Sequence, residues 1–361
     1  MLNPEIVHPF NLEQRTEPAP NFAVLTPFEF LADFRTEAQG AKQRVWAQAM
    51  SMETGTSQNM FFDAIREANE RGLDVKLRID WFSHLTSRDG IHSVIAVKSL
   101  LGLTQRPGPN RLENERMFKT LQENGIDIQF TNYPKLWEII LPYFGRNHMK
   151  MYIVDDVVYL GGMNIEDSCF EQVDFMVKLA DPEVVEEASK QFEYENPTGK
   201  DKKVDFSVGD SLLIDSGKPG RSIILDTAIG LVKGARSSVR NISFFTPDGP
   251  LIRALNTAHQ RGIDVEVLKP DVKWKSIYGI INLKNTTEMK LGHLEVPFAR
   301  SSGGIHAKLL VVDNEVAIFG SHNLMESGVK AGTQEIAYMT INPELVRNLM
   351  GFYSRIRSSA Q

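Results

Sequence analysis

Two histidine–lysine pairs are the residues of this sequence best suited to chemistry: His148 with Lys150, and His306 with Lys308. The members of each pair are two residues apart, so on a strand both side chains would leave the same face. An imidazole can attack phosphorus or move a proton, and an ammonium group can neutralise non-bridging oxygens. Two such pairs therefore predict a site that handles an anion, most simply a phosphodiester.

Each pair opens a segment that reads as an apolar hairpin. The second segment, 306–323, is HAKLLVVDNEVAIFGSHN, and the first, 148–164, is HMKMYIVDDVVYLGGMN. Both contain the spacing H-x-K-x4-D, then an apolar return strand and a glycine-rich end. We expect two buried β-hairpins with polar groups at their open ends. Asp155 and Asp313 stand at the turns and are expected to be structural, fixing the turn or bonding nearby backbone.

The glycine-rich ends supply further groups for a phosphate. We match Gly162 of the first hairpin with Gly320 of the second, which makes both glycines structural parts of the motif. Asn164, Ser321 and Asn323 follow these glycines and are predicted to bind the substrate phosphate beside the lysines. In the first half a methionine takes the place of the serine, so that half offers one hydroxyl fewer.

Two acidic residues are candidates for orienting the histidines. A neutral imidazole that attacks phosphorus needs a partner on its other ring nitrogen, and a carboxylate serves this purpose. Asp174 lies ten residues after Asn164, and Glu335 lies twelve residues after Asn323. The alternative for both is a solvated position on a strand.

The rest of the chain repeats one order of elements around each hairpin. Strand, helix and strand precede the hairpins at 44–49, 61–71 and 73–80, and again at 239–245, 250–261 and 263–268. A strand and a closing helix follow them at 173–180 and 182–194, and again at 335–341 and 343–356. This alternation predicts the α/β class, with two similar lobes, each a mixed β-sheet flanked by helices, packed pseudo-symmetrically around one active site.

The expected division of the chain has three parts. Residues 1–30 are predicted to be an irregular N-terminal arm, 31–198 the first lobe and 199–361 the second, with a linker at 196–201. The first half is longer than the second because of an insertion around 84–115, which is expected at the surface.

Composition limits the class of protein. The chain has 361 residues, is 42% hydrophobic and 24% charged, and carries a net charge of -6, which argues mildly against a dedicated nucleic-acid binder. Its one cysteine, Cys169, is expected to be a small buried apolar group. The sequence shows neither a signal peptide nor an apolar run of about 18 residues. We therefore expect a cytoplasmic protein without a transmembrane helix. Segment 273–290 is either a basic, aromatic membrane-facing stretch or an ordinary amphipathic helix.

The motifs resemble those of the phospholipase D superfamily, whose signature is H-x-K-x4-D followed by G-S-x-N, present twice per active site. The flanks are most similar to soluble relatives of bacterial cardiolipin synthase: RNHMK at 146–150, GGMN at 161–164, FTPD at 245–248 and RGIDV at 261–265. The resemblance covers most of residues 35–357. The sequence departs from it at Met149, where a basic residue is common, and by one missing residue between Asp155 and Gly162.

The resemblance implies a metal-independent phosphodiesterase or phosphatidyltransferase that acts on phospholipids through a phosphohistidine intermediate, with no cofactor and no metal. It implies His148 as the nucleophile and His306 as the general acid and base, an assignment that the near-symmetry of the repeat makes reversible. It also implies that Asp174 and Glu335 each point to the histidine of their own motif. The expected partner is a phospholipid, met by peripheral contact with a membrane surface.

Two other functions remain open from the sequence. A nuclease of the same superfamily would act on nucleic-acid phosphodiesters with the same two motifs, and a catalytically silent protein would only bind phospholipid. The acidic net charge and the cardiolipin synthase-like flanks favour a lipid substrate, and the intact histidines and lysines favour an enzyme. The lipid head group, the acceptor alcohol, the choice between hydrolysis and transfer, and the oligomeric state stay open.

Overall fold

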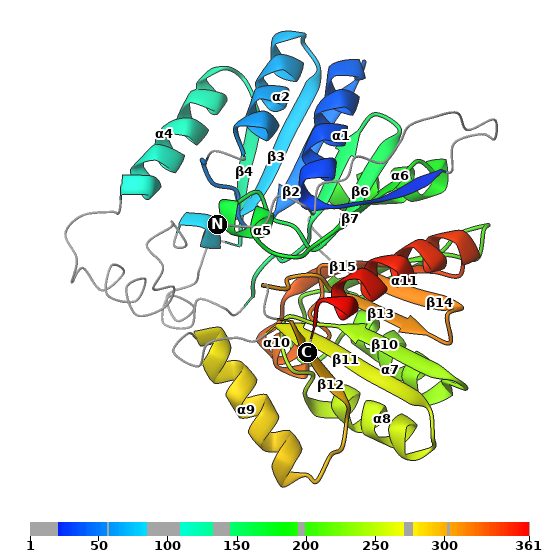
Figure 1. Ribbon diagram of the computed structural model, residues 1–361. Coiled ribbons are helices and arrows are strands. Elements are labelled where there is room, and N and C mark those ends of the chain that lie inside the picture. The colour runs from blue at the N-terminus through cyan, green and yellow to red at the C-terminus, as the bar shows by residue number, and fades with distance from the viewer. Residues whose placement is uncertain are drawn as a thin grey trace.

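The computed structural model describes residues 21–55, 58–84, 109–132, 145–193, 199–270, 277–301 and 304–360. Within them, two β-sheets are stacked and helices cover the outer faces of the stack (Figure 1). This arrangement confirms the predicted α/β class with two similar lobes, each a mixed sheet flanked by helices.

The first sheet has the strand order β1-β7-β6-β5-β2-β3-β4. Its strands are β1 (Phe22–Leu25), β2 (Arg44–Ala49), β3 (Asp74–Asp80), β4 (Asp127–Thr131), β5 (Met151–Val154), β6 (Val157–Gly161) and β7 (Met176–Leu179). Strands β2, β3 and β4 run parallel, whereas β5 pairs antiparallel with both β2 and β6. The hairpin that begins with the first histidine–lysine pair therefore lies in the middle of the sheet.

The second sheet repeats this plan with the order β12-β11-β10-β13-β14-β15-β9-β8. Its strands are β8 (Lys202–Asp205), β9 (Ser211–Ser216), β10 (Ser238–Ile242), β11 (Asp264–Pro270), β12 (Phe298–Ser301), β13 (Leu309–Val312), β14 (Val316–Gly320) and β15 (Gln334–Thr340). Here β13 pairs antiparallel with β10 and β14, so the second hairpin is also central.

Both faces of each hairpin are buried, which explains their continuous apolar runs. In β5, Met151 and Ile153 face a core shared by the two sheets, while Tyr152 faces the outer core of the first lobe. In β13, Leu309 faces the shared core and Leu310 the outer core of the second lobe. Alternate residues of one strand thus serve two different cores.

Helices close these cores. The helices are α1 (Pro27–Gly40), α2 (Asn59–Glu70), α4 (Pro109–Glu123), α5 (Asp167–Phe170), α6 (Pro182–Glu193), α7 (Ile223–Gly234), α8 (Gly249–Gln260), α9 (Ile277–Leu291), α10 (Glu326–Ala331) and α11 (Pro343–Ser358), with a 3-10 turn, η2 (Trp81–His84). α1 and α2 cover the first sheet, α7 and α8 cover the second, and α6 and α11 pack on the shared core (Figure 1). No helix of the described segments is long and apolar enough to cross a membrane.

The structure corrects the expected N-terminal arm. Residues 22–25 form β1, which pairs with β7, and α1 begins at Pro27, so this part of the expected irregular arm belongs to the first lobe. Residues 1–20, most of the insertion at 84–115 and the first part of the linker lie outside the described residues. We propose that the boundary between the lobes stays at 198/199, since the second sheet begins at residue 202.

The two motif aspartates fasten each hairpin turn to the loop before a neighbouring strand. Asp155 accepts hydrogen bonds from the backbone N–H groups of residues 42, 43 and 44 at 2.7, 3.0 and 2.9 Å. Asp313 accepts equivalent bonds from residues 236–238. Burial opposes ionisation, but these N–H groups outweigh it and lower the pKa of Asp313 to about 2. The bonded backbone is distant in sequence rather than nearby, and these contacts agree with a structural role.

We expect Asp155→Asn to lower the free energy of unfolding by about 1–3 kcal/mol, because the amide offers one acceptor oxygen and no charge. Asn tolerates the positive φ of 43° at this position, so backbone strain does not change. The matched control is Asp156→Asn, an exposed neighbour in the same turn, expected to change stability by less than about 0.5 kcal/mol. Urea unfolding measures both, and equal losses would contradict the prediction.

Candidate active site

The histidine–lysine pairs lie just before the strands in the chain rather than on them. His148 and Lys150 occupy an extended segment that ends where β5 begins at Met151, and His306 and Lys308 precede β13 in the same way. The expected placement on a strand is therefore wrong by a few residues. The reason is that these segments leave their own sheet and pair with the other lobe.

Backbone hydrogen bonds join each segment to the opposite lobe. The N–H of His148 donates to the carbonyl of Gln334 at 2.9 Å, and the N–H of Gln334 donates to the carbonyl of Arg146 at 2.8 Å. In the other direction, the N–H of His306 donates to the carbonyl of Val173 at 2.9 Å. Two equivalent short β-bridges thus join the lobes, one at each histidine segment.

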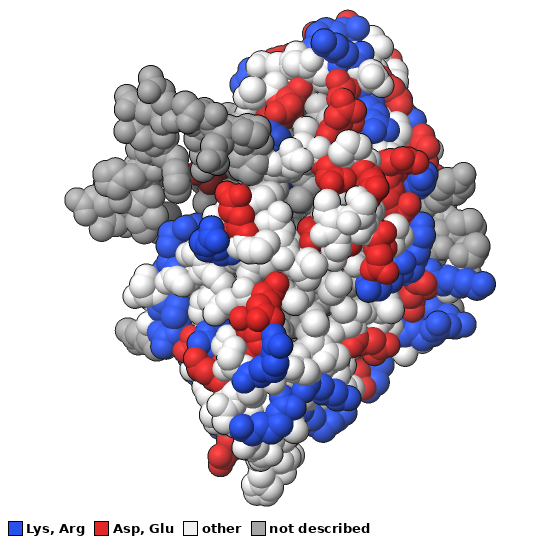
Figure 2. Space-filling model, turned by 90° about the vertical axis from the view of Figure 1, so that its right-hand side faces the viewer, with Lys and Arg blue, Asp and Glu red and all other residues white. Residues whose placement is uncertain are grey.

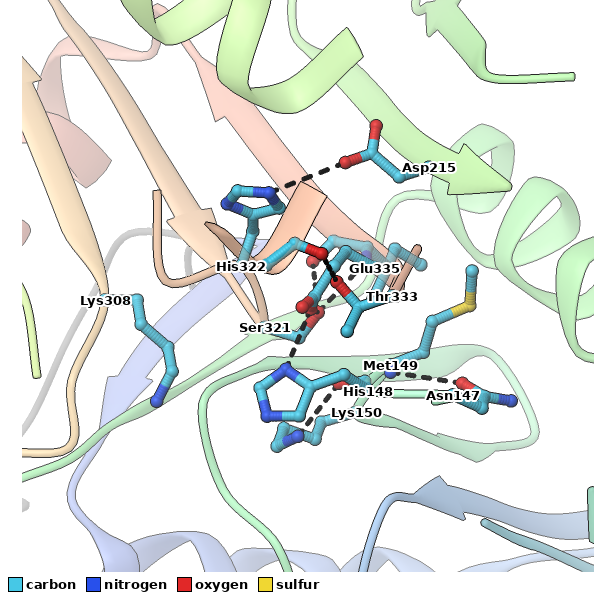
Figure 3. Close-up of polar contacts among 12 residues, drawn as sticks. Asn147, His148, Met149, Lys150, Asp215, Lys308, Ser321, His322, Thr333 and Glu335 are labelled. Atoms are coloured by element: carbon cyan, nitrogen blue, oxygen red, sulfur yellow. Dashed lines mark hydrogen bonds and ion pairs between the residues drawn. The ribbon is translucent and has the colours of Figure 1, made fainter. Parts of the chain in front are cut away.

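These bridges bring each histidine next to the carboxylate of the other lobe. His148 Nδ1 lies 2.9 Å from Glu335 Oε2 (Figure 3), and His306 Nδ1 lies 2.7 Å from Asp174 Oδ2. The expectation that each acid points to the histidine of its own motif is therefore wrong. The bridges place the residue before each acid against the other lobe's histidine, so that each carboxylate comes to lie beside that ring.

Burial sets the ionisation of these groups. Removal from water lowers the pKa of His148 to about 4, and removal from water together with the Lys308 charge lowers the pKa of His306. Burial opposes ionisation of Glu335 too, but the charge and hydrogen bond of His148 lower its pKa to about 2. At neutral pH each imidazole is neutral and donates its Nδ1–H to a carboxylate, so the lone pair lies on Nε2.

The lysines are buried beneath the histidines. Lys150 is 0% exposed and Lys308 is 3% exposed. Lys150 Nζ donates to the carbonyl of His148 at 2.8 Å, and Lys308 Nζ donates to the carbonyl of His306 and lies 3.0 Å from His306 Nε2. Burial lowers the pKa of both lysines, that of Lys150 to about 8, which leaves it charged at neutral pH.

A cavity of about 560 Å³ connects the two halves of the site. Its wall includes His148, His306, Asn164 and Asn323, which come from both lobes. The Asn164 amide donates to Glu166 at 3.2 Å, whereas the buried Asn323 Oδ1 has no hydrogen-bond partner among the described residues. The cavity therefore offers two imidazoles and two amides to a bound group.

Ser321 lies elsewhere than expected. Its side chain is 0% exposed, its hydroxyl donates to Glu335, and the backbone N–H of Ile336 donates to the hydroxyl oxygen at 3.0 Å. It does not line the cavity, so its contacts support the carboxylate of Glu335 rather than a phosphate.

Sheet register also corrects the match between the two glycine-rich ends. β6 ends at Gly161 and β14 at Gly320, and each of these residues pairs with the strand residue two positions after the acid. Gly161 is thus the counterpart of Gly320, and Gly162 is the counterpart of Ser321. The earlier match was one residue off because the first hairpin turn is one residue shorter.

Steric crowding explains why residue 162 is a glycine. A Cβ at this position would lie 2.7 and 2.8 Å from the two carboxylate oxygens of Asp174. The first lobe therefore combines a shorter acid with a glycine. The second combines the longer Glu335 with Ser321, whose hydroxyl reaches that carboxylate.

Sequence reasoning missed the group that anchors the first motif. Asp80, at the end of β3, is 1% exposed and accepts a bond from the backbone N–H of Asn147 at 2.6 Å. It also pairs with the buried Arg146, which lines the cavity, at 3.2 Å. The available signal was Arg146 itself, since a buried arginine next to a motif requires an acid elsewhere.

Two further residues, His322 and Cys169, lie near the site. His322 lines the cavity, accepts the backbone N–H of Leu324 at Nδ1 and lies 3.7 Å from Asp215 through Nε2 (Figure 3). Burial raises the pKa of Asp215 to about 6. Cys169 is buried, and burial raises the pKa of its thiol, which agrees with a packing role. No cluster of His, Cys, Asp and Glu within the described residues is arranged to hold a metal ion.

Comparison with known proteins adds a family. The family model described as "Cardiolipin synthase, PLD-like domain" matches residues 34–195 and 229–356. The chain is 24% identical over 228 residues to cardiolipin synthase A of Edwardsiella ictaluri, covering 56% of this chain and 47% of that protein. It is 26% identical over 249 residues to the major cardiolipin synthase ClsA of Bacillus subtilis, covering 60% and 49%. The chain spans about half the length of these curated relatives.

Solved structures share the fold. Phosphatidylserine synthase of Haemophilus influenzae superimposes with a TM-score of 0.68 at 15% identity, over 95% of this chain and 88% of that chain. Polyphosphate kinase of Porphyromonas gingivalis superimposes with a TM-score of 0.59 at 13% identity, over 92% and 46%. At these identities the likeness concerns the fold alone.

The asymmetry between Gly162 and Ser321 predicts unequal effects of reciprocal substitutions. Gly162→Ser places a Cβ against Asp174 and is expected to move that carboxylate from His306, lowering kcat by about 100-fold or more. Ser321→Gly removes only a hydroxyl from Glu335 and is expected to lower kcat by about tenfold. Turnover of bis(p-nitrophenyl) phosphate, with circular dichroism to confirm folding, measures both. Equal effects in the two folded variants would refute the steric argument.

Proposed function

The chain belongs to the phospholipase D-like family of cardiolipin synthases, and we propose that it is an enzyme that moves the phosphatidyl group of phospholipids to water or to an alcohol. One observation carries the proposal: two neutral histidines, each bonded to a carboxylate from the other lobe, line one cavity above two buried lysines. Such a set supplies a nucleophile, a proton donor and charge neutralisation for a phosphodiester without a metal.

In the proposed first step, His148 Nε2 attacks phosphorus and a P–N bond forms while the P–O bond to the leaving alcohol breaks. The departing alkoxide takes a proton from His306 Nε2. In the second step, water or an acceptor alcohol gives its proton to His306, attacks phosphorus and breaks the P–N bond. The amides of Asn164 and Asn323 hold the non-bridging oxygens, and the charges of Lys150 and Lys308 stabilise them from beneath the histidines. The carboxylates hold the imidazoles in one tautomer.

Hydrogen bonding supports this division of roles. Lys308 engages the Nε2 of His306, whereas among the described residues no hydrogen bond engages the Nε2 of His148. A free lone pair is what a nucleophile needs. A bound phosphate anion adds negative charge beside both rings and favours protonation of one of them, which prepares His306 as the acid.

The charge around the cavity favours a lipid over a nucleic acid. Four acidic residues of the first lobe line the cavity besides Glu335: Glu53, Glu166, Asp167 and Glu171. A polyanion would meet repulsion there, whereas a lipid brings a single phosphodiester with a neutral or cationic head group. The face shown in Figure 2 intermixes basic and acidic side chains rather than gathering one basic stripe. We therefore place the nuclease second, and a silent lipid binder third because the motif groups are intact.

The substrate of such an enzyme resides in a bilayer. We therefore propose peripheral contact with a membrane surface, from the cytoplasm, as the working arrangement.

Incubation with vesicles of phosphatidylglycerol and, separately, phosphatidylethanolamine tests the function. We expect phosphatidic acid, cardiolipin or a head-group exchange product by mass spectrometry, unchanged by EDTA, because no step uses a metal. Single-stranded DNA serves as the competing substrate and His148→Ala/His306→Ala as the inactive control. Cleavage of DNA with no lipid product would make the protein a nuclease.

A second measurement assigns the histidines. With an activated ester such as a p-nitrophenyl phosphodiester, leaving-group protonation matters little, so His306→Ala is expected to form a covalent adduct and lose it slowly. His148→Ala is expected to form none. Intact-protein mass after acid-free quenching reports the adduct. An adduct on His148→Ala but not on His306→Ala would reverse the assignment, and normal turnover with no adduct on any form would rule out the two-step mechanism.

A further inference from the structure

Helix α9 packs against the second lobe with two asparagines and with Met289, which contacts the outer core of that lobe. The side-chain oxygen of Asn282 accepts the backbone N–H of Thr246 at 2.6 Å, and Asn285 donates to the carbonyl of Thr246 at 2.9 Å. Asn285 is 1% exposed. The inward side of α9 therefore combines one apolar contact with hydrogen bonds to one backbone loop, where a surface helix ordinarily packs a full apolar stripe.

The outward side of α9 carries three exposed aliphatic side chains. Ile280, Leu283 and Leu291 are 58%, 59% and 77% exposed. Residues 280, 283, 287 and 291 follow one another at helical spacing and form one stripe along the helix, in which Thr287 is the polar member. Lys284 and Lys290 are exposed beside this stripe, Lys284 in an ion pair with Glu288 at 3.2 Å. An exposed aliphatic stripe with lysines at its margin is the composition of a helix that lies on a bilayer surface.

The stripe continues into the cavity described above. Ile281, next to the first stripe residue, lines the cavity together with Phe244 and Phe245. Helix α9 projects from the edge of the second sheet, apart from the packed layers, as Figure 1 shows. A single turn of helix thus presents apolar side chains both to the outside and to the cavity wall.

We propose that this outward side of α9, defined by Ile280, Leu283 and Leu291 with Lys284 and Lys290, binds the surface of an anionic phospholipid bilayer. The inference rests on the proposed function, since the bilayer is where a phospholipid substrate would be met. The aliphatic stripe enters the boundary between head groups and acyl chains, the lysines face anionic head groups, and Ile281 leads from that boundary to the cavity. The sequence leaves two interpretations of segment 273–290 open, a membrane-facing stretch and an ordinary amphipathic helix. The exposed aliphatic residues of α9 favour the membrane-facing one; residues 271–276 lie outside the described residues.

Co-sedimentation of the full chain with vesicles tests this surface without requiring turnover. We expect binding to vesicles of phosphatidylglycerol in phosphatidylcholine, and roughly tenfold weaker binding for Ile280→Ser/Leu283→Ser, because two aliphatic groups no longer enter the interface. Lys284→Gln/Lys290→Gln is expected to lose part of the preference for anionic over pure phosphatidylcholine vesicles.

The matched control is Val208→Ser/Ile341→Ser. These two aliphatic residues are 58% and 45% exposed, and they lie at the β8–β9 edge of the second sheet, opposite to the β12 edge that carries α9. The control is expected to bind as the parent does. Absence of vesicle binding by the parent, unchanged binding by Ile280→Ser/Leu283→Ser, or an equal loss in the control would each overturn the inference. Vesicle binding without any lipid product would instead count against the proposed function alone.

Discussion

The contact between each histidine and the carboxylate of the other lobe is the interaction on which the site depends. His148 with Glu335 and His306 with Asp174 are separated by 187 and 132 residues in sequence, yet each pair closes to hydrogen-bond distance. Removal of either carboxylate would leave a buried imidazole without the partner that fixes its tautomer. Neither lobe holds a complete pair by itself, so the packing of the lobes and the formation of the site are one event.

The shared core explains how such a contact is kept at fixed geometry. Apolar residues of β5 and β13 pack in one core between the two sheets, and α6 and α11 close the same core. Close-packed interiors resist small displacements, which is what a pair of catalytic groups on two different lobes requires. The aspartates at the far ends of the hairpins add a second constraint, since each fastens its turn to the loop before a neighbouring strand.

The repeat is symmetric in backbone and unequal in chemistry. A short acid with Gly162 serves one histidine, and a longer acid with Ser321 serves the other. Lys308 engages the reactive nitrogen of His306, while Lys150 bonds only the carbonyl of His148 among the contacts described. A two-step transfer needs one nucleophile and one proton carrier. The different contacts of His148 and His306 within two similar lobes are the feature that would separate these two roles.

Local patterns in the sequence determined the class of fold, the two hairpins and the histidine–lysine pairs, because apolar alternation and short motif spacing need no knowledge of distant residues. The tertiary structure alone decided which acid serves which histidine, because two β-bridges between the lobes set that pairing. The tertiary structure also decided that Ser321 supports Glu335, because the register of the strands, and not the order of residues in the motif, aligns the two halves. For α9, the sequence left two interpretations open, and hydrogen bonds between its asparagines and one distant loop fix the orientation in which Ile280, Leu283 and Leu291 are exposed.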